Sequence, residues 1–480
     1  MITEFTQFSF ETAAPESVGI DSEAIAAFEA RLRAEKLGHQ GYMIYRSRKL
    51  AASAIASPYR FTDKRHVYSI SKSYTSTAVG IAVDEGLISV EDSVISFFPE
   101  LLPGKVSENL AAMKIKHLLT MNTGHQDDTL GRVATREPGW AKRFLSLTVE
   151  NASGTHFAYN STATYMLSAI ITKVTGMRMV DYLRTRLFNP LGIDGVTWEE
   201  SPDGISDGGW GIHVSPEDML KLGVLYLNRG VWNGQRIISE EWVKAATSYQ
   251  SDNSANRDAD WHQGYGYQFW RCRHDSFRAD GAFGQYIIVS PDKELVTVII
   301  SETGRMQAVL DAYWDTIYAS LRSEPLPPRT VECDVLPRPY LELPEKLCRP
   351  VEPVEYRVSE NRLGLSKLSI RSEGEALILR LGSAHERSVE LICGAGRWVY
   401  NRFLHCPVMP TGFLGPLSVG VFAEIAASWG GEADSSKLLI RLQFVSTPHG
   451  FMFELDPDRR VLSVTTTLDH IASPVELDLI

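Results

Sequence analysis

The chain has 480 residues, which is enough for two or three domains with a substantial hydrophobic core. Its 44% hydrophobic and 22% charged residues are typical of a soluble globular protein. A formal net charge of −11 argues against a protein that binds nucleic acid or an anionic membrane through a basic surface. No apolar run approaches the ~20 residues of a membrane span. The start, Met1-Ile2-Thr3-Glu4-Phe5, lacks the basic and apolar regions of a secretory signal, so we expect a cytoplasmic protein.

The cysteines and histidines form no pattern typical of a disulfide framework or a metal site. Five cysteines, at positions 272, 333, 348, 393 and 406, are odd in number and include no C-x-x-C pair. This spacing favours buried free thiols. The twelve histidines include no H-E-x-x-H pattern. We therefore expect no bound metal and no other cofactor.

The first predicted elements are a hairpin and a helix. Residues 41–46 and 50–56 are typical of two strands joined through the basic turn Ser47-Arg48-Lys49. Farther along, Ile70, Tyr74, Ala78 and Ile81 recur at spacings of four, four and three, which predicts an amphipathic helix. Gly86 follows at the place where a left-handed residue ends many helices.

Ser69 and Lys72 lie at the start of this predicted helix, in the sequence Ser69-Ile70-Ser71-Lys72. Residues three apart share a helix face, so the Lys72 ammonium can reach the Ser69 hydroxyl. The free N–H groups and the dipole of a helix N-terminus favour a developing anion. We interpret the motif as a serine nucleophile, its activating amine and half of an oxyanion hole. The alternative is an exposed helix that carries an ordinary serine and lysine.

Two other serine motifs are interpreted as coincidental. Ser290-Pro291-Asp292-Lys293 repeats the S-x-x-K pattern, but it lies between two apolar runs and predicts a hairpin turn. Gly204-Ile205-Ser206-Asp207-Gly208 matches the G-x-S-x-G nucleophile elbow. That elbow needs a buried strand before it and a helix after it, whereas polar and glycine-rich segments flank this one.

Tyr159-Asn160-Ser161 precedes a second predicted helix, in which the stripe from Leu167 to Val174 is apolar and Gly176 ends the pattern. A tyrosine at a helix entrance beside polar residues is a plausible proton carrier for a serine enzyme. The Y-x-S pattern also starts at positions 45, 249 and 318, so only context and order favour Tyr159. Ser161 either takes part in catalysis or caps the helix, and the two roles are compatible.

The next segments predict more helices and strands. Ser215-Pro216-Glu217-Asp218 is typical of a helix start, and Gly230 ends that helix. Residues 286–289 and 295–300 predict strands, followed by a helix over 310–322. Tyr265, Tyr267 and Trp270 alternate as in a strand, and core packing explains most of them. Strands at both ends with helices between them favour an α+β fold, an antiparallel sheet flanked by helices with a helical subdomain.

Beyond the proline-rich segment at 323–329 the chain changes character. Alternating apolar residues over 438–444 and 451–455, a turn at 456–459 and a run at 461–467 predict strands. We therefore predict a serine hydrolase domain over residues 1–325 and an all-β accessory domain, a sandwich or a barrel, over residues 330–480.

Residues 10 to about 322 resemble the serine β-lactamase and penicillin-binding protein superfamily, in its class C-like branch of esterases, D-aminopeptidases and aminohexanoate-oligomer hydrolases. Ser69 and Lys72 match the first motif, and Tyr159 and Ser161 match the second. The segments 116–124 and 208–219 are also similar to this branch. The resemblance implies a β-lactamase/D,D-peptidase-like fold in which Ser69, Lys72 and Tyr159 are catalytic and Ser161 contacts substrate.

The third motif of that superfamily, Lys-Thr-Gly or His-x-Gly on an edge strand, falls on Ala279-Asp280-Gly281. Gly281 lets a backbone approach a ligand closely, and the resemblance implies that the Ala282 N–H is the second oxyanion donor beside that of Ser69. Ala279 stands where the superfamily has a cation, which argues against penicillin-like substrates. Arg278 or Arg273 could supply that charge instead. Asp280 either contacts substrate or is an exposed turn acid.

We therefore predict a metal-independent serine hydrolase that acts through an acyl-enzyme on a small ester or amide. A β-lactamase or D-alanyl-type peptidase that uses the same residues is the first alternative, and a binding protein that senses acylating ligands without turnover is the second. We expect a small-molecule partner, no nucleic acid and no membrane, and the oligomeric state stays open. His125 is expected on a solvated loop rather than at the pocket.

Overall fold

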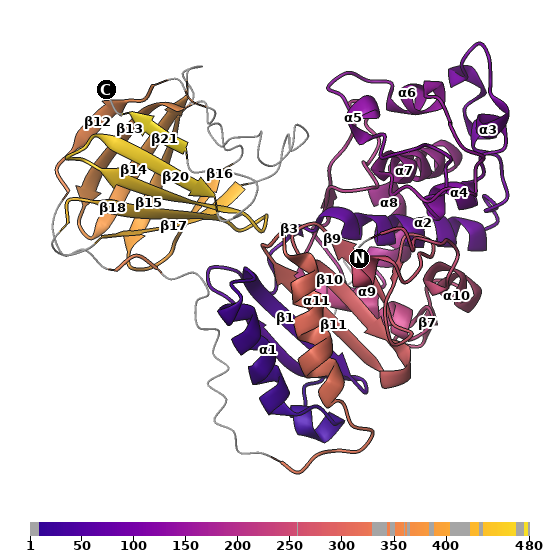
Figure 1. The fold of residues 1–480 in the computed structure, drawn as a ribbon, viewed down its shortest axis with the longest axis horizontal. Coiled ribbons are helices and arrows are strands. Elements are labelled where there is room, and N and C mark those ends of the chain that lie inside the picture. The colour runs from indigo at the N-terminus through magenta and orange to yellow at the C-terminus, as the bar shows by residue number, and fades with distance from the viewer. Residues whose placement is uncertain are drawn as a thin grey trace, which may run out of the picture.

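The computed structural model describes residues 9–256, 258–328, 343–345, 351–359, 361, 365–383, 388–403, 423–431, 435–466 and 475–478. Two bodies lie side by side in Figure 1, a mixed helix and sheet part up to residue 328 and a C-terminal sheet. Three hydrophobic clusters form the cores: two on opposite faces of the N-terminal sheet and one inside the C-terminal sheet.

The N-terminal part is built around a six-stranded antiparallel sheet in the order β2-β1-β11-β10-β9-β8. Its strands are β1 (His39–Arg46), β2 (Lys49–Ile55), β8 (Trp270–Arg271), β9 (Phe277–Gly281), β10 (Gln285–Ser290) and β11 (Leu295–Ser301). The predicted hairpin is confirmed as β1 and β2. Because β1 pairs with β11, the two ends of this part of the chain meet in the middle of the sheet.

Both faces of this sheet are covered by helices, and the period of two residues along β1 divides its side chains between them. Tyr42 and Ile44 belong to the cluster under α1 (Ser22–Ala34) and α11 (Met306–Tyr313). Met43 and Tyr45 belong to the cluster on the opposite face, which extends into the remaining helices. A sheet buried on both faces explains why its strands are almost continuously apolar.

The remaining helices carry most of the motif-bearing segments. They are α2 (Ser71–Asp84), α3 (Glu108–Ala111), α4 (Ile115–Leu119), α5 (Leu130–Val133), α6 (Trp140–Ser146), α7 (Ser161–Thr175), α8 (Met179–Leu183), α9 (Pro216–Leu227) and α10 (Glu240–Thr247). The predicted helices after residues 69, 160 and 215 are confirmed as α2, α7 and α9. Asn160, not Ser161, caps α7: its side chain accepts from the Thr162 and Ala163 N–H groups.

Shorter elements connect these helices and strands. Small sheets pair β3 (Arg65–His66) with β5 (Ile212–Val214), β5 with β4 (Thr197–Trp198), and β6 (Val231–Trp232) with β7 (Gln235–Arg236). The 3₁₀ turns are η1 (Pro15–Val18), η2 (Tyr68–Ile70), η3 (Val94–Phe97), η4 (Pro99–Leu101), η6 (Ala259–Trp261) and η7 (Pro291–Lys293). Single π-helical segments follow α8 and α11, at η5 (Arg184–Phe188) and η8 (Trp314–Tyr318).

The boundaries predicted for the last helix of the N-terminal part are wrong. The sequence predicts a helix over 310–322, whereas α11 begins at Met306, passes through the π-helical η8 and remains helical to position 320. No side chain caps the start of α11, so the sequence carried no signal for it. The change to π-helix has no signature in the apolar periodicity either.

The C-terminal body is one curled, ten-stranded sheet rather than a sandwich of two sheets (Figure 1). Its strands are β12 (Val354–Arg357), β13 (Leu365–Glu373), β14 (Ala376–Ser383), β15 (Ser388–Ala395), β16 (Val399–Phe403), β17 (Ala423–Gly430), β18 (Leu438–Phe444), β19 (Gly450–Asp456), β20 (Val461–Thr466) and β21 (Val475–Asp478). All its pairings are antiparallel except β15 with β17. The α+β fold class with a C-terminal all-β domain is confirmed, and the division at 325–330 stays a prediction.

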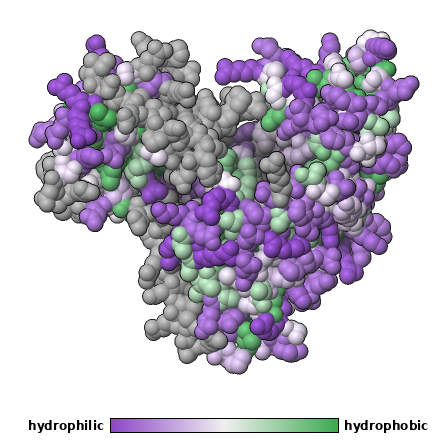
Figure 2. All heavy atoms as spheres, viewed as in Figure 1, coloured by the Kyte–Doolittle hydropathy of each residue, from purple (hydrophilic) through white to green (hydrophobic). Residues whose placement is uncertain are grey.

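The described surface is mainly polar on the face drawn in Figure 2, where apolar residues form scattered patches. The exposed large apolar side chains are spread over distant elements: Leu87, Met177, Tyr249, Ile392 and Tyr400. Within the described ranges, no helix is both long and apolar enough to cross a membrane. Cys272 and Cys393 are buried free thiols as predicted, and the other three cysteines lie outside the described residues.

Candidate active site

Ser69 lies in the 3₁₀ turn η2, which runs directly into α2. The Ser71 hydroxyl donates to the Tyr68 carbonyl at 2.6 Å and closes this turn. Tyr68 has a φ of 51°, an uncommon left-handed conformation for a residue other than glycine. Ser69 is partly accessible to solvent, as a nucleophile must be. Strained residues of this kind gather at functional sites.

Lys72 is buried, with 1% of its surface exposed, and its Nζ lies 3.0 Å from Ser69 Oγ. The Nζ also lies 2.7 Å from the Gly209 carbonyl oxygen and 3.4 Å from Ser161 Oγ. Burial lowers the pKa of Lys72 to about 8, against the smaller opposing effects of the Asp128 and Asp280 carboxylates. About a tenth of Lys72 is therefore neutral at pH 7, far more than for an exposed lysine. A neutral amine has two N–H groups for Gly209 and Ser161 and one lone pair for the Ser69 hydroxyl.

The Gly209 carbonyl reaches Lys72 because position 209 has no side chain. A Cβ there would lie 2.5 Å from the Ser161 carbonyl oxygen, closer than real Cβ atoms come. Glycine therefore allows the loop after β4 to approach α7, and the backbone of that loop supplies a permanent acceptor for the lysine.

Tyr159 lies immediately before α7 and faces both motif residues. The Ser69 side chain lowers the pKa of the Tyr159 phenol against the larger effect of burial, and the Lys72 Nζ lies 4.7 Å from the centre of its ring. The ring stacks on Trp270 at 5.3 Å between centroids. Burial, together with the nearby Asp280 carboxylate, raises the pKa of Tyr159 well above its usual value. The phenol is therefore neutral in the resting enzyme and is suited to donate a proton.

Ser161 contacts the Lys72 amine and is itself held by the Asp128 carboxylate. Ser161 N–H donates to Asp128 Oδ1 at 3.1 Å, and its hydroxyl lies 3.4 Å from Asp128 Oδ2. Asp128 is an exposed loop residue that no spacing pattern in the sequence distinguishes. Its carboxylate holds Ser161 in place and tunes Lys72 through its charge.

The end of β9 lies against the segment that carries Ser69. A Cβ on Gly281 would lie 2.1 Å from the Val67 carbonyl oxygen, so only glycine allows this approach. Ala282 follows directly, and Phe283 then adopts a left-handed φ of 67°. The backbone N–H of Ala282 thus belongs to a segment packed against the turn of Ser69, which is where a second oxyanion donor is required.

The charge near the third motif is a buried, internally neutral pair rather than a free cation. Arg278 Nε donates to Asp280 Oδ2 at 3.0 Å, and both residues are buried on β9. Ala279 points the other way and packs in the hydrophobic core, so a lysine at this position would face apolar side chains. The interpretation of Asp280 as an exposed turn acid is wrong: only 7% of its surface is exposed, and its charge acts on Lys72 and Tyr159.

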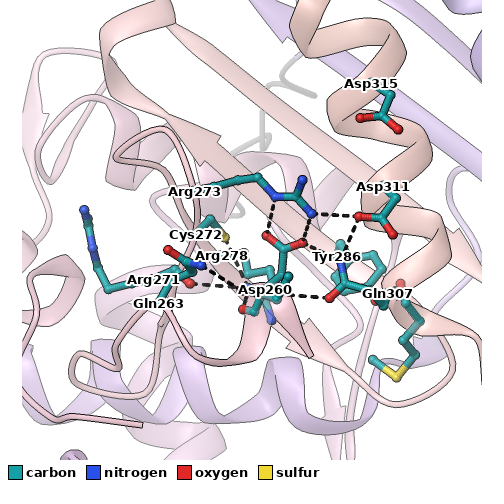
Figure 3. A network of polar contacts seen from close by, with 12 residues as sticks. Asp260, Gln263, Arg271, Cys272, Arg273, Arg278, Tyr286, Gln307, Asp311 and Asp315 are labelled. Atoms are coloured by element: carbon teal, nitrogen blue, oxygen red, sulfur yellow. Dashed lines mark hydrogen bonds and ion pairs between the residues drawn. The ribbon is translucent and has the colours of Figure 1, made fainter. Parts of the chain in front are cut away.

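The neighbouring arginines are likewise engaged by protein groups, as Figure 3 shows. Arg273 Nη2 binds both Asp260 and Asp311 at 2.7 Å. Arg278 Nη1 donates to the Asp260 carbonyl oxygen at 2.7 Å. Neither arginine presents an unneutralised charge to a substrate carboxylate.

Some of the other sequence predictions are confirmed and others are wrong. His125 is fully buried and forms a hydrogen bond with the Thr123 hydroxyl, so its predicted place on a solvated loop is wrong. Of the three aromatic residues predicted in one strand, only Trp270 lies in one, and both Trp270 and Tyr265 have ring contacts with Tyr159. Ser290 precedes the tight turn η7 between β10 and β11 as predicted, and no helix follows Ser206. Within the described ranges, no three His, Cys, Asp or Glu side chains converge as metal ligands.

Comparison with known proteins gives the same assignment of fold. The family model described as Beta-lactamase matches residues 35–319. The 6-aminohexanoate-dimer hydrolase of Paenarthrobacter ureafaciens is 26% identical over 319 residues, which cover 60% of this chain and 79% of that protein. The octameric penicillin-binding protein homologue from Pyrococcus abyssi superposes with a TM-score of 0.51 and 17% identity, and covers 87% of this chain and 97% of that one. The hydrolase EstCE1, which has promiscuous acyltransferase activity, superposes with a TM-score of 0.51 and 15% identity over 61% of this chain and 99% of its own.

The family match spans more than half of the chain and includes all the residues gathered around Ser69. The chain therefore belongs to the Beta-lactamase family of enzymes.

Proposed function

We propose that this enzyme hydrolyses small, neutral esters or amides through an acyl-enzyme on Ser69. The observation that carries the proposal is the 3.0 Å contact between Ser69 Oγ and the buried Lys72 Nζ, whose pKa is lowered to about 8. An amine with that pKa is a far better base at neutral pH than an exposed lysine, whose pKa is about 10.4. Two relatives, an aminohexanoate-dimer hydrolase and the hydrolase EstCE1, support ester and amide chemistry.

In the proposed mechanism, Lys72 Nζ removes the Ser69 proton while Oγ attacks the substrate carbonyl. Backbone N–H groups of Ser69 and Ala282 bind the resulting oxyanion, and each is worth roughly a hundredfold or more in rate. The neutral Tyr159 hydroxyl gives its proton to the leaving group, and the Lys72 ammonium, which holds the proton taken from Ser69, restores it. Water then attacks the acyl-enzyme by the same path in reverse. Ser161, Asp280 and Gly281 line the substrate side.

The preference for neutral substrates follows from the electrostatics of the third motif. Asp280 neutralises Arg278, and Asp260 with Asp311 neutralises Arg273. A substrate carboxylate beside the scissile bond thus gains no charge-assisted hydrogen bond from these arginines, an interaction typically worth about 1.5–3 kcal/mol. Penicillins and cephalosporins carry such a carboxylate, so we expect them to be poorer substrates than short-chain esters.

The test combines covalent labelling with turnover. Wild type should be labelled at Ser69 by a fluorophosphonate and should hydrolyse nitrophenyl butyrate with a higher kcat/KM than a chromogenic cephalosporin. Ser69→Ala should lose the label and roughly four or more orders of magnitude of turnover, because no other group replaces the nucleophile. Ser290→Ala, in the second S-x-x-K motif, is the matched control and should retain activity.

Three results would contradict this proposal. A covalent adduct on Ser69→Ala, seen by intact mass, would place the nucleophile elsewhere. A preference for the cephalosporin would favour a β-lactamase or D-alanyl-type peptidase. Labelling of Ser69 without turnover of any ester or amide would favour an acylation sensor.

A further inference from the structure

The C-terminal domain reaches the candidate active site through the loop between β18 and β19, residues 445–449. The Ser446 carbonyl accepts from His66 N–H at 2.8 Å, three residues before Ser69. The Pro448 carbonyl accepts from Gln40 Nε2 at 2.7 Å. This loop is therefore hydrogen-bonded to both β3 and β1 of the N-terminal part.

His449, at the end of this loop, is held in one orientation by a carboxylate. Its Nδ1 lies 3.1 Å from Glu302 Oε1, and each residue has only 6% of its surface exposed. A carboxylate only accepts, so Nδ1 is the donor, and in the tautomer with its proton on Nδ1 the Nε2 atom accepts. The Nε2 partner is the hydroxyl of Tyr68, the residue before the nucleophile. Burial raises the pKa of Tyr68, which keeps that hydroxyl protonated as the donor.

The same imidazole contacts the second half of the oxyanion hole. Its ring meets Phe283 edge-to-face at 4.9 Å and 83°, and Phe283 in turn meets Tyr68 at 5.1 Å and 76°. Tyr68 precedes Ser69, and Phe283 follows Ala282. These two aromatic residues flank the two N–H donors, and both adopt left-handed backbone conformations. Such conformations persist only where the surroundings hold them.

We propose that His449 is a positioning residue for the oxyanion hole, so that the C-terminal domain completes the active site in this chain. The proposal rests on the proposed function, since it assumes that Ser69 and Ala282 supply the oxyanion donors. His449 touches neither substrate nor Ser69. It acts by holding Tyr68 through a hydrogen bond and Phe283 through ring contact, and Glu302 fixes its own orientation.

The predicted effect falls on the chemical step rather than on substrate binding. Oxyanion donors act most strongly on the charge that develops in the transition state, and small displacements weaken them. His449→Ala should lower kcat for nitrophenyl butyrate about ten- to a hundredfold, within the range seen when an oxyanion donor is impaired. Its KM should change by less than about threefold, since ground-state binding is largely untouched.

The experiment uses the full-length chain and a matched control at the same interface. Tyr400→Phe removes the hydrogen bond from the Tyr400 hydroxyl to the Pro58 carbonyl, 2.7 Å long, which joins the two parts away from Tyr68 and Phe283. This control should keep the wild-type kcat. His449→Gln keeps an acceptor for the Tyr68 hydroxyl and should recover part of the loss. The rate of fluorophosphonate labelling at Ser69 should fall in parallel with kcat.

A double variant tests whether His449 acts on kcat through its hydrogen bond with the Tyr68 hydroxyl. Tyr68→Phe should lower kcat less than His449→Ala does, because the ring contacts remain. Adding Tyr68→Phe to His449→Ala should cost little more, because the partner of the hydroxyl is already gone. If the losses of kcat in the two single variants multiply in the double variant, the hydrogen bond between Tyr68 and His449 does not carry the effect.

Several outcomes overturn the inference while leaving the proposed function intact. Wild-type kcat in His449→Ala would do so, as would a raised KM with unchanged kcat, which would make the loop a substrate contact. An equal loss of kcat in Tyr400→Phe would show that any weakened contact between the two domains lowers kcat, with no specific role for His449. A wild-type enzyme that is neither labelled at Ser69 nor active on the ester would instead overturn the proposed function itself.

Discussion

Lys72 shows how burial lowers the pKa of an ordinary side chain, as the proposed role of a base requires. Desolvation favours the neutral amine, and two carboxylates, Asp128 and Asp280, pull its pKa part of the way back. The Gly209 carbonyl and the Ser161 hydroxyl then orient the nitrogen toward Ser69. The value near 8 is therefore a balance of nearby groups, and each of them is open to a test.

The pH dependence of the reaction should report this balance. Because the neutral amine is the active form, kcat/KM should rise about tenfold per pH unit on the acid side and level off near pH 8. Asp128→Asn removes a charge that raises the lysine pKa, so the midpoint of the rise should move to lower pH. The pH–rate profile for nitrophenyl butyrate measures this shift.

Asp127→Asn is the control for that shift. This neighbouring carboxylate pairs with Arg132 and does not act on Lys72, so the midpoint should stay in place. A midpoint that moves to higher pH in Asp128→Asn would contradict the assignment of Lys72 as the base.

At the scale of single elements, the helix that covers the sheet below the site begins at a complete capping box. The Ser215 hydroxyl accepts from Asp218 N–H at 3.2 Å, while Asp218 Oδ2 accepts from Ser215 N–H at 2.9 Å. Pro216 occupies the first helical position, where its missing N–H costs nothing. Helix α9 is thus defined locally, which explains why its start was predictable.

Removal of this cap should destabilise the fold measurably. Ser215→Ala leaves a buried N–H without its acceptor and should lower the free energy of unfolding by about 1 kcal/mol, within the usual range of about 0.5–2 kcal/mol. Urea unfolding followed by circular dichroism measures the difference. Ser146→Ala, an exposed position at the end of α6, should change stability by less than about 0.5 kcal/mol. Equal stability of Ser215→Ala and wild type would show that the cap contributes nothing.

At the scale of the whole molecule, buried polar groups join the two parts. Gln40 on β1 donates to the Tyr59 hydroxyl at 3.0 Å and to the Pro448 carbonyl at 2.7 Å. Its own oxygen accepts from the buried guanidinium of Arg65 at 2.5 Å. Gln443 on β18 also donates to Tyr59, so one tyrosine hydroxyl is shared between the domains. Such a network is stabilising only while every member keeps its partners.

Gln40→Leu should therefore cost more stability than its size suggests. The leucine fills similar volume but leaves the Arg65 guanidinium and the Pro448 carbonyl without this partner, which should cost about 3 kcal/mol. Calorimetry of the full-length chain should show a lower unfolding midpoint. Glu454→Gln, which removes an exposed ion pair with Lys437 on the C-terminal sheet, should leave the midpoint nearly unchanged. An unchanged midpoint in Gln40→Leu would contradict a structural role for this interface.

The sequence by itself determined the features that depend on local spacing. Ser69 and Lys72 share a face because they are three residues apart on a helix, and the apolar periods of α2, α7 and the β18–β19 hairpin predicted those elements. Helix ends marked by a cap, as at Ser215, were predictable, whereas the unmarked start of α11 was not.

Only the tertiary structure decided which distant groups surround Ser69. Nothing local indicates that the Gly209 carbonyl binds Lys72, that Asp280 is buried against Arg278, or that His125 lies in the core. His449 meets Tyr68 across 381 positions of sequence, through a loop of the other domain. Periodicity encodes which side of an element is buried, but it does not encode which element will cover it. Those contacts arise when distant elements pack and bury polar groups together, since each buried group must then find its partner.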